Sequence, residues 1–136
     1  FDPRYRPSLT QQRQVESGRL GRKSGRGYYD HSGTTAPPAP KNDPELQDMI
    51  FRRILAMLIN EPAAALYHGI AERDALELAM TKGVNYPKGL LRWADEIGLD
   101  RCLSMLQSLQ TEYGEDRYRP SPLLRRMVRE GRTFHG

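Results

Sequence analysis

An internal repeat constrains the fold of this 136-residue chain more than any other feature of its sequence. The pentapeptide Arg-Tyr-Arg-Pro-Ser occurs at residues 4–8 and again at residues 117–121. At the same offset, nine of sixteen aligned positions are identical, which exceeds chance and predicts the same structural element twice. Because residues 32–116 precede only the second copy, we expect the chain to begin at the tail of one repeat and to continue through a second.

The region between the two copies has the composition of a linker. Residues 31–42 contain three prolines and almost no large apolar side chain, which is typical of a semi-extended connection. We therefore predict three regions: the tail of a preceding repeat at 1–30, a Pro-rich linker at 31–43, and a domain at 44–136.

The domain opens with the signals of a long helix. Asp43 is suited to the N-cap and Pro44 to the first turn, where a missing N–H costs nothing. The following apolar residues recur at spacings of three and four, which predicts a core helix, kinked at Pro62. These residues are Leu46, Met49, Ile50, Ile54, Met57, Leu58 and Leu66.

Glycines and capping residues divide the rest of the chain into short helices, and no segment alternates as a strand would. The first copy of the repeat predicts a capped helix at about 8–17 and then a Gly-rich, hairpin-like extension. We therefore predict an all-α fold: a compact domain of about five helices preceded by a helix-plus-hairpin-like tail and the linker. Four later helices are expected. The first spans about 72–82 and is ended by Gly83, and the second spans about 89–97 and is ended by Gly98. The third runs from its cap at Asp100 to Gly114, and the fourth from Ser121-Pro122 to Gly131.

The charge is unevenly distributed. The net charge of +4 combines +4 in residues 1–31, −5 in residues 32–116 and +5 in residues 117–136. The single cysteine, Cys102, excludes an intrachain disulfide and a four-thiolate zinc site, and no apolar run has the length of a membrane span. A reducing, cytoplasmic location without membrane contact is therefore expected.

The basic ends raise two binding hypotheses. The stretch from Gly18 to Gly27 lacks the spacing of a phosphate loop, which needs a glycine directly before its lysine. With Tyr28 and Tyr29, the same stretch is compatible with RNA binding, although no nucleic-acid-binding motif accompanies it. A non-enzymatic module that binds nucleic acid or another acidic partner through its basic ends remains the alternative function.

The sequence contains no self-sufficient active site. Its histidines lie far apart and away from other metal-ligating residues, so no metal site is predicted. The cysteine has no activating neighbour and is expected to pack in a helix, the acidic pairs are expected to be solvated, and the tryptophan is expected to anchor the core. These residues are His31, His68, His135, Cys102, Asp95-Glu96, Glu115-Asp116 and Trp93.

Several strings resemble one family, the C-terminal domain of NAD-dependent 3-hydroxyacyl-CoA dehydrogenases, in its two-copy type. Residues 85–100 (NYPKGLLRWADEIGLD) are similar to the family's Pro-x-Gly segment, helix and Asp-x-x-Gly-Leu-Asp turn. Residues 117–132 are similar to its closing helix, and residues 4–30 to that helix with its Gly-rich ending. The resemblance implies the end of a first copy followed by a second copy.

The resemblance also implies that the chemistry lies elsewhere. In this family NAD and the catalytic residues belong to an N-terminal nucleotide-binding domain, and the C-terminal domain adds a substrate-contacting Asn eight residues before an Asn-Glu pair. Here the pair is Asn60-Glu61, and Arg52 occupies the position of that Asn. Arginine is longer and charged, so no catalytic, cofactor-binding or metal-binding residue is expected in this chain.

The implied parent enzyme is an oxidoreductase of fatty-acid metabolism (β-oxidation) that acts on an acyl-CoA. Its acyl group is left open between 3-hydroxybutyryl, a longer chain and 3-hydroxyadipyl. This fragment is expected to be inactive alone and to bind no cofactor. It is expected to serve assembly, dimerisation through helical domains, and closure of the acyl-CoA site. Its expected partners are the N-terminal nucleotide-binding domain, the first C-terminal-domain copy and a second parent molecule.

Overall fold

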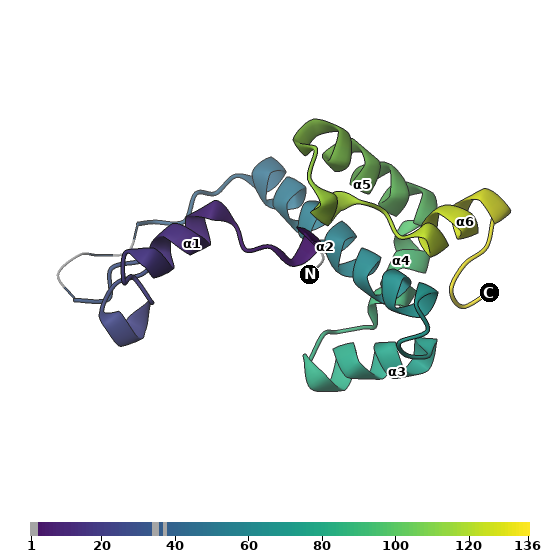
Figure 1. Cartoon of the computed structure of the whole chain (residues 1–136), viewed down its shortest axis with the longest axis horizontal. Coiled ribbons are helices and arrows are strands. Elements are labelled where there is room, and N and C mark those ends of the chain that lie inside the picture. The colour runs from purple at the N-terminus through teal and green to yellow at the C-terminus, as the bar shows by residue number, and fades with distance from the viewer. Residues whose placement is uncertain (1–2, 34–35, 37) are drawn as a thin grey trace. The chain divides into compact units, whose positions relative to one another are not determined.

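The computed structural model describes residues 3–33, 36 and 38–136. It divides the chain into two compact units, Phe1–Asp43 and Pro44–Gly136, shown with their helices in Figure 1. The predicted all-α class is confirmed, since the described residues form helices and only isolated β-bridges. None of the helices in these described ranges is long and apolar enough to cross a membrane.

The second unit is built around one central helix, α2, which packs against α4, α5 and α6. Its helices are α2 (Pro44–Tyr67), α3 (Arg73–Leu78), α4 (Leu90–Ile97), α5 (Leu99–Tyr113) and α6 (Pro122–Glu130). A π-helical turn, Ala79–Gly83, follows α3, and a 3₁₀ turn, Asp116–Tyr118, precedes α6.

Most helix ends lie where the capping signals predict them. Ser121 caps α6 by accepting a hydrogen bond from the N–H of Leu123, and Gly131 ends it in the left-handed conformation. Two helix ends differ from the prediction. The helix α3 ends at Leu78 and continues as the π-helical turn Ala79–Gly83, so Gly83 lies within that turn and does not end the helix in the left-handed conformation. Gly98, at φ 99°, separates α4 from α5, so α5 begins at Leu99 and Asp100 lies in its first turn rather than capping it.

A carboxylate from another helix caps α4. Glu77 Oε1 accepts hydrogen bonds from the N–H groups of Leu91 (2.7 Å) and Arg92 (3.3 Å). A negative charge is favourable at a helix N-terminus. A Cβ atom at position 89 would displace the Glu77 carboxylate, so glycine there keeps this cap in place. The Pro-x-Gly segment therefore lets α3 dock against the start of α4.

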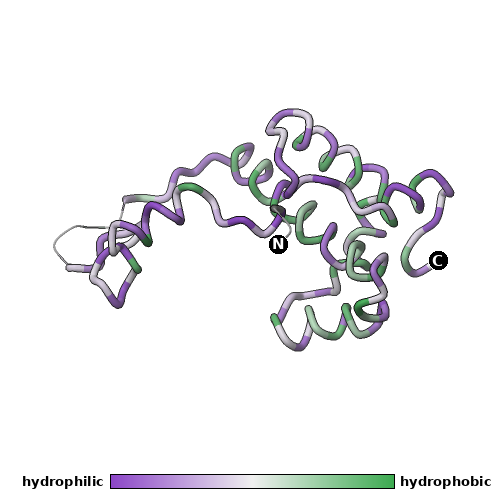
Figure 2. Tube along the Cα trace, in the orientation of Figure 1, coloured by the Kyte–Doolittle hydropathy of each residue, from purple (hydrophilic) through white to green (hydrophobic). Residues whose placement is uncertain are grey.

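The core lies where α2, α4, α5 and α6 meet, and it includes Ile59, Leu91, Leu106 and Leu124, all of them fully buried. The helix α2 is a core helix as predicted, with Leu55 and Ile59 buried, but the N-terminal half of its apolar stripe is exposed. Four residues of that stripe, which we call the α2 face, remain exposed: Leu46 (36%), Met49 (57%), Ile50 (46%) and Ile54 (51%). Figure 2 shows the hydrophobic residues in these first turns of α2. Periodicity identifies an apolar face but not its partner.

The first unit contains α1 (Leu9–Glu16) and a tight Gly-rich turn. Ser8 and Gln11 form a reciprocal capping box at the start of α1. After the helix, Ser24 holds a hairpin-like turn: its hydroxyl oxygen lies 2.8 Å from the N–H of Leu20, which donates, and 2.8 Å from the carbonyl oxygen of Arg26. The predicted helix and hairpin-like extension are both present.

Candidate functional site

The second copy of the pentapeptide is bound in the second unit by two side chains of α2. The first is Arg53, which donates hydrogen bonds to the hydroxyl groups of Tyr118 and of Tyr113. Its guanidinium lies 4.4 Å from the ring centroid of Tyr113 and 5.1 Å from that of Tyr118. The hydrogen bond to Tyr118 raises the pKa of Arg53 above its ordinary value. The guanidinium thus contacts both tyrosines through hydrogen bonds and through cation–π interactions.

The second side chain is Asn60, which is fully buried. Its Nδ2 donates to the carbonyl oxygen of Arg119 at 3.0 Å, and its Oδ1 accepts from the N–H of Ser121 at 2.7 Å. Both bonds go to backbone groups, so the amide fixes the path of the chain into α6. We call Arg53 and Asn60, which lie seven residues apart on one face of α2, the pentapeptide seat.

The first copy of the pentapeptide is in a different environment. Tyr5 is 58% exposed, whereas its counterpart Tyr118 is 2% exposed. At the positions of the buried Leu124 and Met127 of α6, helix α1 carries glutamines, Gln11 and Gln14.

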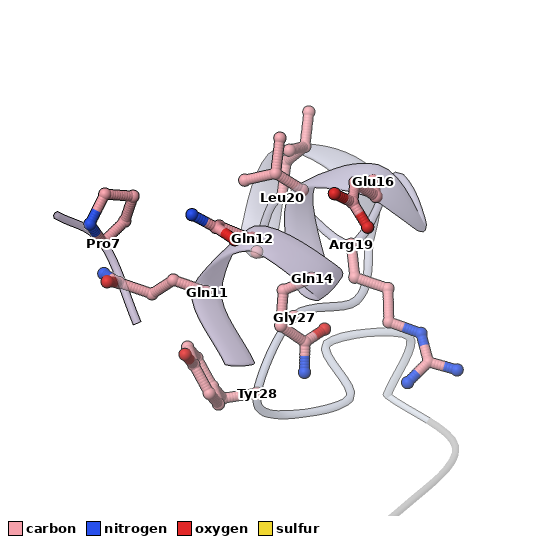
Figure 3. Close-up of a pocket in the computed structure, with 11 residues that line it drawn as sticks. Pro7, Gln11, Gln12, Gln14, Glu16, Arg19, Leu20, Gly27 and Tyr28 are labelled. Carbon is pink, nitrogen blue, oxygen red and sulfur yellow. The ribbon is translucent and has the colours of Figure 1, made fainter. Parts of the chain in front are cut away.

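These glutamines line an open hollow of about 630 Å³ within the first unit. Figure 3 shows Gln11, Gln14 and Tyr28 around this hollow, with Leu20 on another side of it. Val15, Leu20 and Tyr28 are each 63% exposed. The first unit therefore presents a face of mixed apolar and amide character.

Arg52 lies at the mouth of a second cleft, between α2, α4 and α5. Its Nε is 2.7 Å from a carboxylate oxygen of Asp48, one turn earlier on α2. The cleft has a volume of about 300 Å³. Trp93 lies in its wall, half-buried, with its ring centroid 6.0 Å from that of Phe51. Trp93 packs against the core, as predicted, and also lines the cleft.

The cysteine, the possible metal ligands and the acidic residues considered above show no sign of a catalytic or metal site. Cys102 is 2% exposed, and burial raises its pKa to about 11, which opposes a role as a nucleophile. In the described part of the chain, no three metal-ligating side chains come together. Of the acidic pair at 95–96, Glu96 is solvated as predicted, since its side chain is 49% exposed in an ion pair with Lys88. The side chain of Asp95 is only 16% exposed.

Asp95 is a structural residue that the sequence interpretation missed. Its carboxylate accepts from the N–H groups of Phe134 (2.8 Å) and His135 (3.0 Å) and contacts His135 Nδ1 at 2.8 Å. The C-terminal tail is thereby held to α4. No local signal predicts this contact, because the partners lie 39 and 40 residues away.

The family model of the 3-hydroxyacyl-CoA dehydrogenase C-terminal domain matches residues 49–134. A probable 3-hydroxybutyryl-CoA dehydrogenase of Deinococcus radiodurans is 45% identical over 82 residues, which are 60% of this chain and 30% of that protein. A 3-hydroxyadipyl-CoA dehydrogenase of Escherichia coli K12 is 48% identical over 77 residues, 57% of this chain and 16% of that protein.

A solved structure extends the similarity to both units. The crystal structure of 3-hydroxybutyryl-CoA dehydrogenase from Escherichia coli K12 matches 96% of this chain at 27% identity and a TM-score of 0.75. The match covers 46% of that chain, so this chain spans less than half the length of the relatives described. On the strength of the family match, the chain belongs to the 3-hydroxyacyl-CoA dehydrogenase C-terminal-domain family.

Proposed function

We propose that this chain is the helical C-terminal part of an NAD-dependent 3-hydroxyacyl-CoA dehydrogenase and that its function is assembly of the parent enzyme. The parent oxidises its acyl-CoA substrate on a nucleotide-binding domain outside these residues. The relatives with the same C-terminal domain carry dehydrogenase names, which supports this activity for the parent. The observation that carries the assembly function is the exposed α2 face.

The α2 face has the pattern of an interface rather than of a solvated surface. Its four residues follow one another at spacings of three, one and four, and therefore share one side of the helix. Large contiguous apolar patches are rare on monomeric proteins and mark association sites. We propose that this face packs on the same face of a second molecule, as an isologous two-fold contact would.

For the first unit we propose a partner other than a second molecule of the same chain. In the second unit the pentapeptide is bound by the pentapeptide seat of α2, with an Arg and an Asn seven residues apart. We propose that residues 4–8 bind an equivalent helix of a preceding copy of the domain. This contact would bury Gln11 and Gln14 of α1. Because buried amides need hydrogen-bond partners, the preceding copy would have to present polar groups to these two glutamines.

The residues present do not fit NAD. The dinucleotide fold of such enzymes places a Gly-rich turn between a strand and a helix. Here the Gly-rich stretch follows α1, and Ser24 ties its backbone into a closed turn. At Gly27 a Cβ atom would collide with the backbone of Gly21, so these glycines serve the turn itself. No catalytic step is therefore assigned to this chain.

The mass of the chain in solution tests the assembly function. We expect a dimer by light scattering after size exclusion, and a monomer after Ile54→Glu, because a charge in the α2 face opposes burial. Ile70→Glu is the matched control, since Ile70 is 74% exposed outside the α2 face, and it should leave the dimer intact. A monomeric wild-type chain at high micromolar concentration would contradict the proposed contact.

Catalysis tests the other part of the proposal. The chain alone should show no NAD reduction with 3-hydroxybutyryl-CoA above a heat-treated control. Measurable turnover by the purified chain would contradict the assignment of hydride transfer to another domain.

A further inference from the structure

The cleft beside Arg52 has the features of a small-molecule site. Apolar side chains form its floor and walls, and Phe51, Trp93, Ile97 and Met105 are those that remain accessible at least in part. A ligand in the cleft would therefore contact apolar side chains of α2, α4 and α5. The cleft volume of about 300 Å³ lies at the lower end of the range of small-molecule pockets, about 300–1,000 Å³. A short apolar chain fits such a space, whereas a large cofactor does not.

The mouth of the cleft is polar and carries a net positive charge. Arg52 from α2 and Arg101 from α5 both line it, and Asp48 is the carboxylate among its lining residues. Asp48 pairs with Arg52, with side chains 54% and 63% exposed, so this ion pair is weak. A guanidinium has five N–H donors in a planar fork and binds a carboxylate through two of them. Arg52 thus retains donors for a second carboxylate.

From these two features we infer that the cleft binds an aliphatic carboxylate, with the carboxylate between Arg52 and Arg101 and the methylene chain over the floor. The inference goes beyond the proposed function, because it assigns a ligand site of its own to a domain that was expected only to serve assembly and closure of the acyl-CoA site. It also gives a role to Arg52, the residue at the position where the family resemblance implies a neutral Asn. Arginine suits a free carboxylate, which carries a charge that a neutral oxygen lacks.

Trp93 provides a direct readout of binding. It is the one tryptophan of the chain, and it lines the cleft. Octanoate, titrated below the concentration at which it forms micelles, should change the Trp93 fluorescence saturably, and calorimetry should give one site per chain. 1-Octanol, which has the same chain without the charge, should bind about tenfold more weakly, because the charge-assisted hydrogen bonds are lost.

Variants separate a specific site from general attraction to a basic protein. Arg52→Gln and Arg101→Gln should each raise the Kd for octanoate about tenfold, and both positions are exposed, so the fold should persist. Arg125→Gln removes the same charge from an exposed position on α6 outside the cleft and should leave the Kd unchanged.

Three results would overturn the inference: no saturable signal with octanoate, equal affinity for 1-octanol, or an equal loss of affinity in all three arginine variants. The experiment uses neither NAD nor an acyl-CoA. Its failure would therefore leave the proposed assembly function standing, and failure of the dimer test would leave this site standing.

Discussion

Replacement of Asn60 by alanine tests the pentapeptide seat most directly. The side chain is fully buried and joins two backbone groups that lie 59 and 61 residues further along the chain. Asn60→Ala removes both hydrogen bonds without adding bulk or charge. The N–H of Ser121, a residue that is 1% exposed, then loses this acceptor in a buried setting.

The expected loss follows from these contacts. Leaving a buried donor unsatisfied costs about 1–3 kcal/mol, and the space left by the amide adds about 1 kcal/mol. The free energy of unfolding should therefore fall by about 2–4 kcal/mol. With a urea slope of about 2 kcal/mol/M, the midpoint should fall by about 1–2 M.

Urea unfolding followed by far-UV circular dichroism and by Trp93 fluorescence measures this loss. Asn42→Ala is the matched control, because it deletes the same amide at an exposed position and should change stability by less than about 0.5 kcal/mol. If Asn60→Ala also loses less than about 0.5 kcal/mol, the two hydrogen bonds do not hold the chain at the entry to α6, and the reasoning fails.

Three further predictions concern other contacts in the second unit. Gly89→Ala should lower the melting temperature by several degrees, about 1–2 kcal/mol, because its Cβ displaces the carboxylate that caps α4, whereas Gly83→Ala, with open space around its Cβ, should not. Burial raises the pKa of Cys102 from 9.0 to about 11. The folded state therefore keeps a proton that the unfolded state releases, and stability should fall between pH 9 and 11 in the wild type more than in Cys102→Ala. Asp95→Ala should speed amide hydrogen exchange at Phe134, whose N–H loses its acceptor; unchanged exchange would show that other contacts hold the tail.

Local sequence determined the helices and most of their ends. Ser8 and Ser121 cap helices in both copies, and Gly18 and Gly131 both take the left-handed conformation after them. These signals act within about four residues, so they can be interpreted without knowledge of the fold. The all-α class and the hairpin-like tail follow from the same kind of evidence.

Only the tertiary structure decided which surfaces are buried and which distant residues meet. The α2 face has the spacing of a core stripe, yet it is exposed, because burial depends on a partner and not on periodicity. The bonds of Asn60 to the chain before α6, of Glu77 to α4 and of Asp95 to the tail span 14 to 61 residues. The Arg52 cleft likewise joins α2, α4 and α5. Such contacts arise from helix packing, which no local pattern encodes.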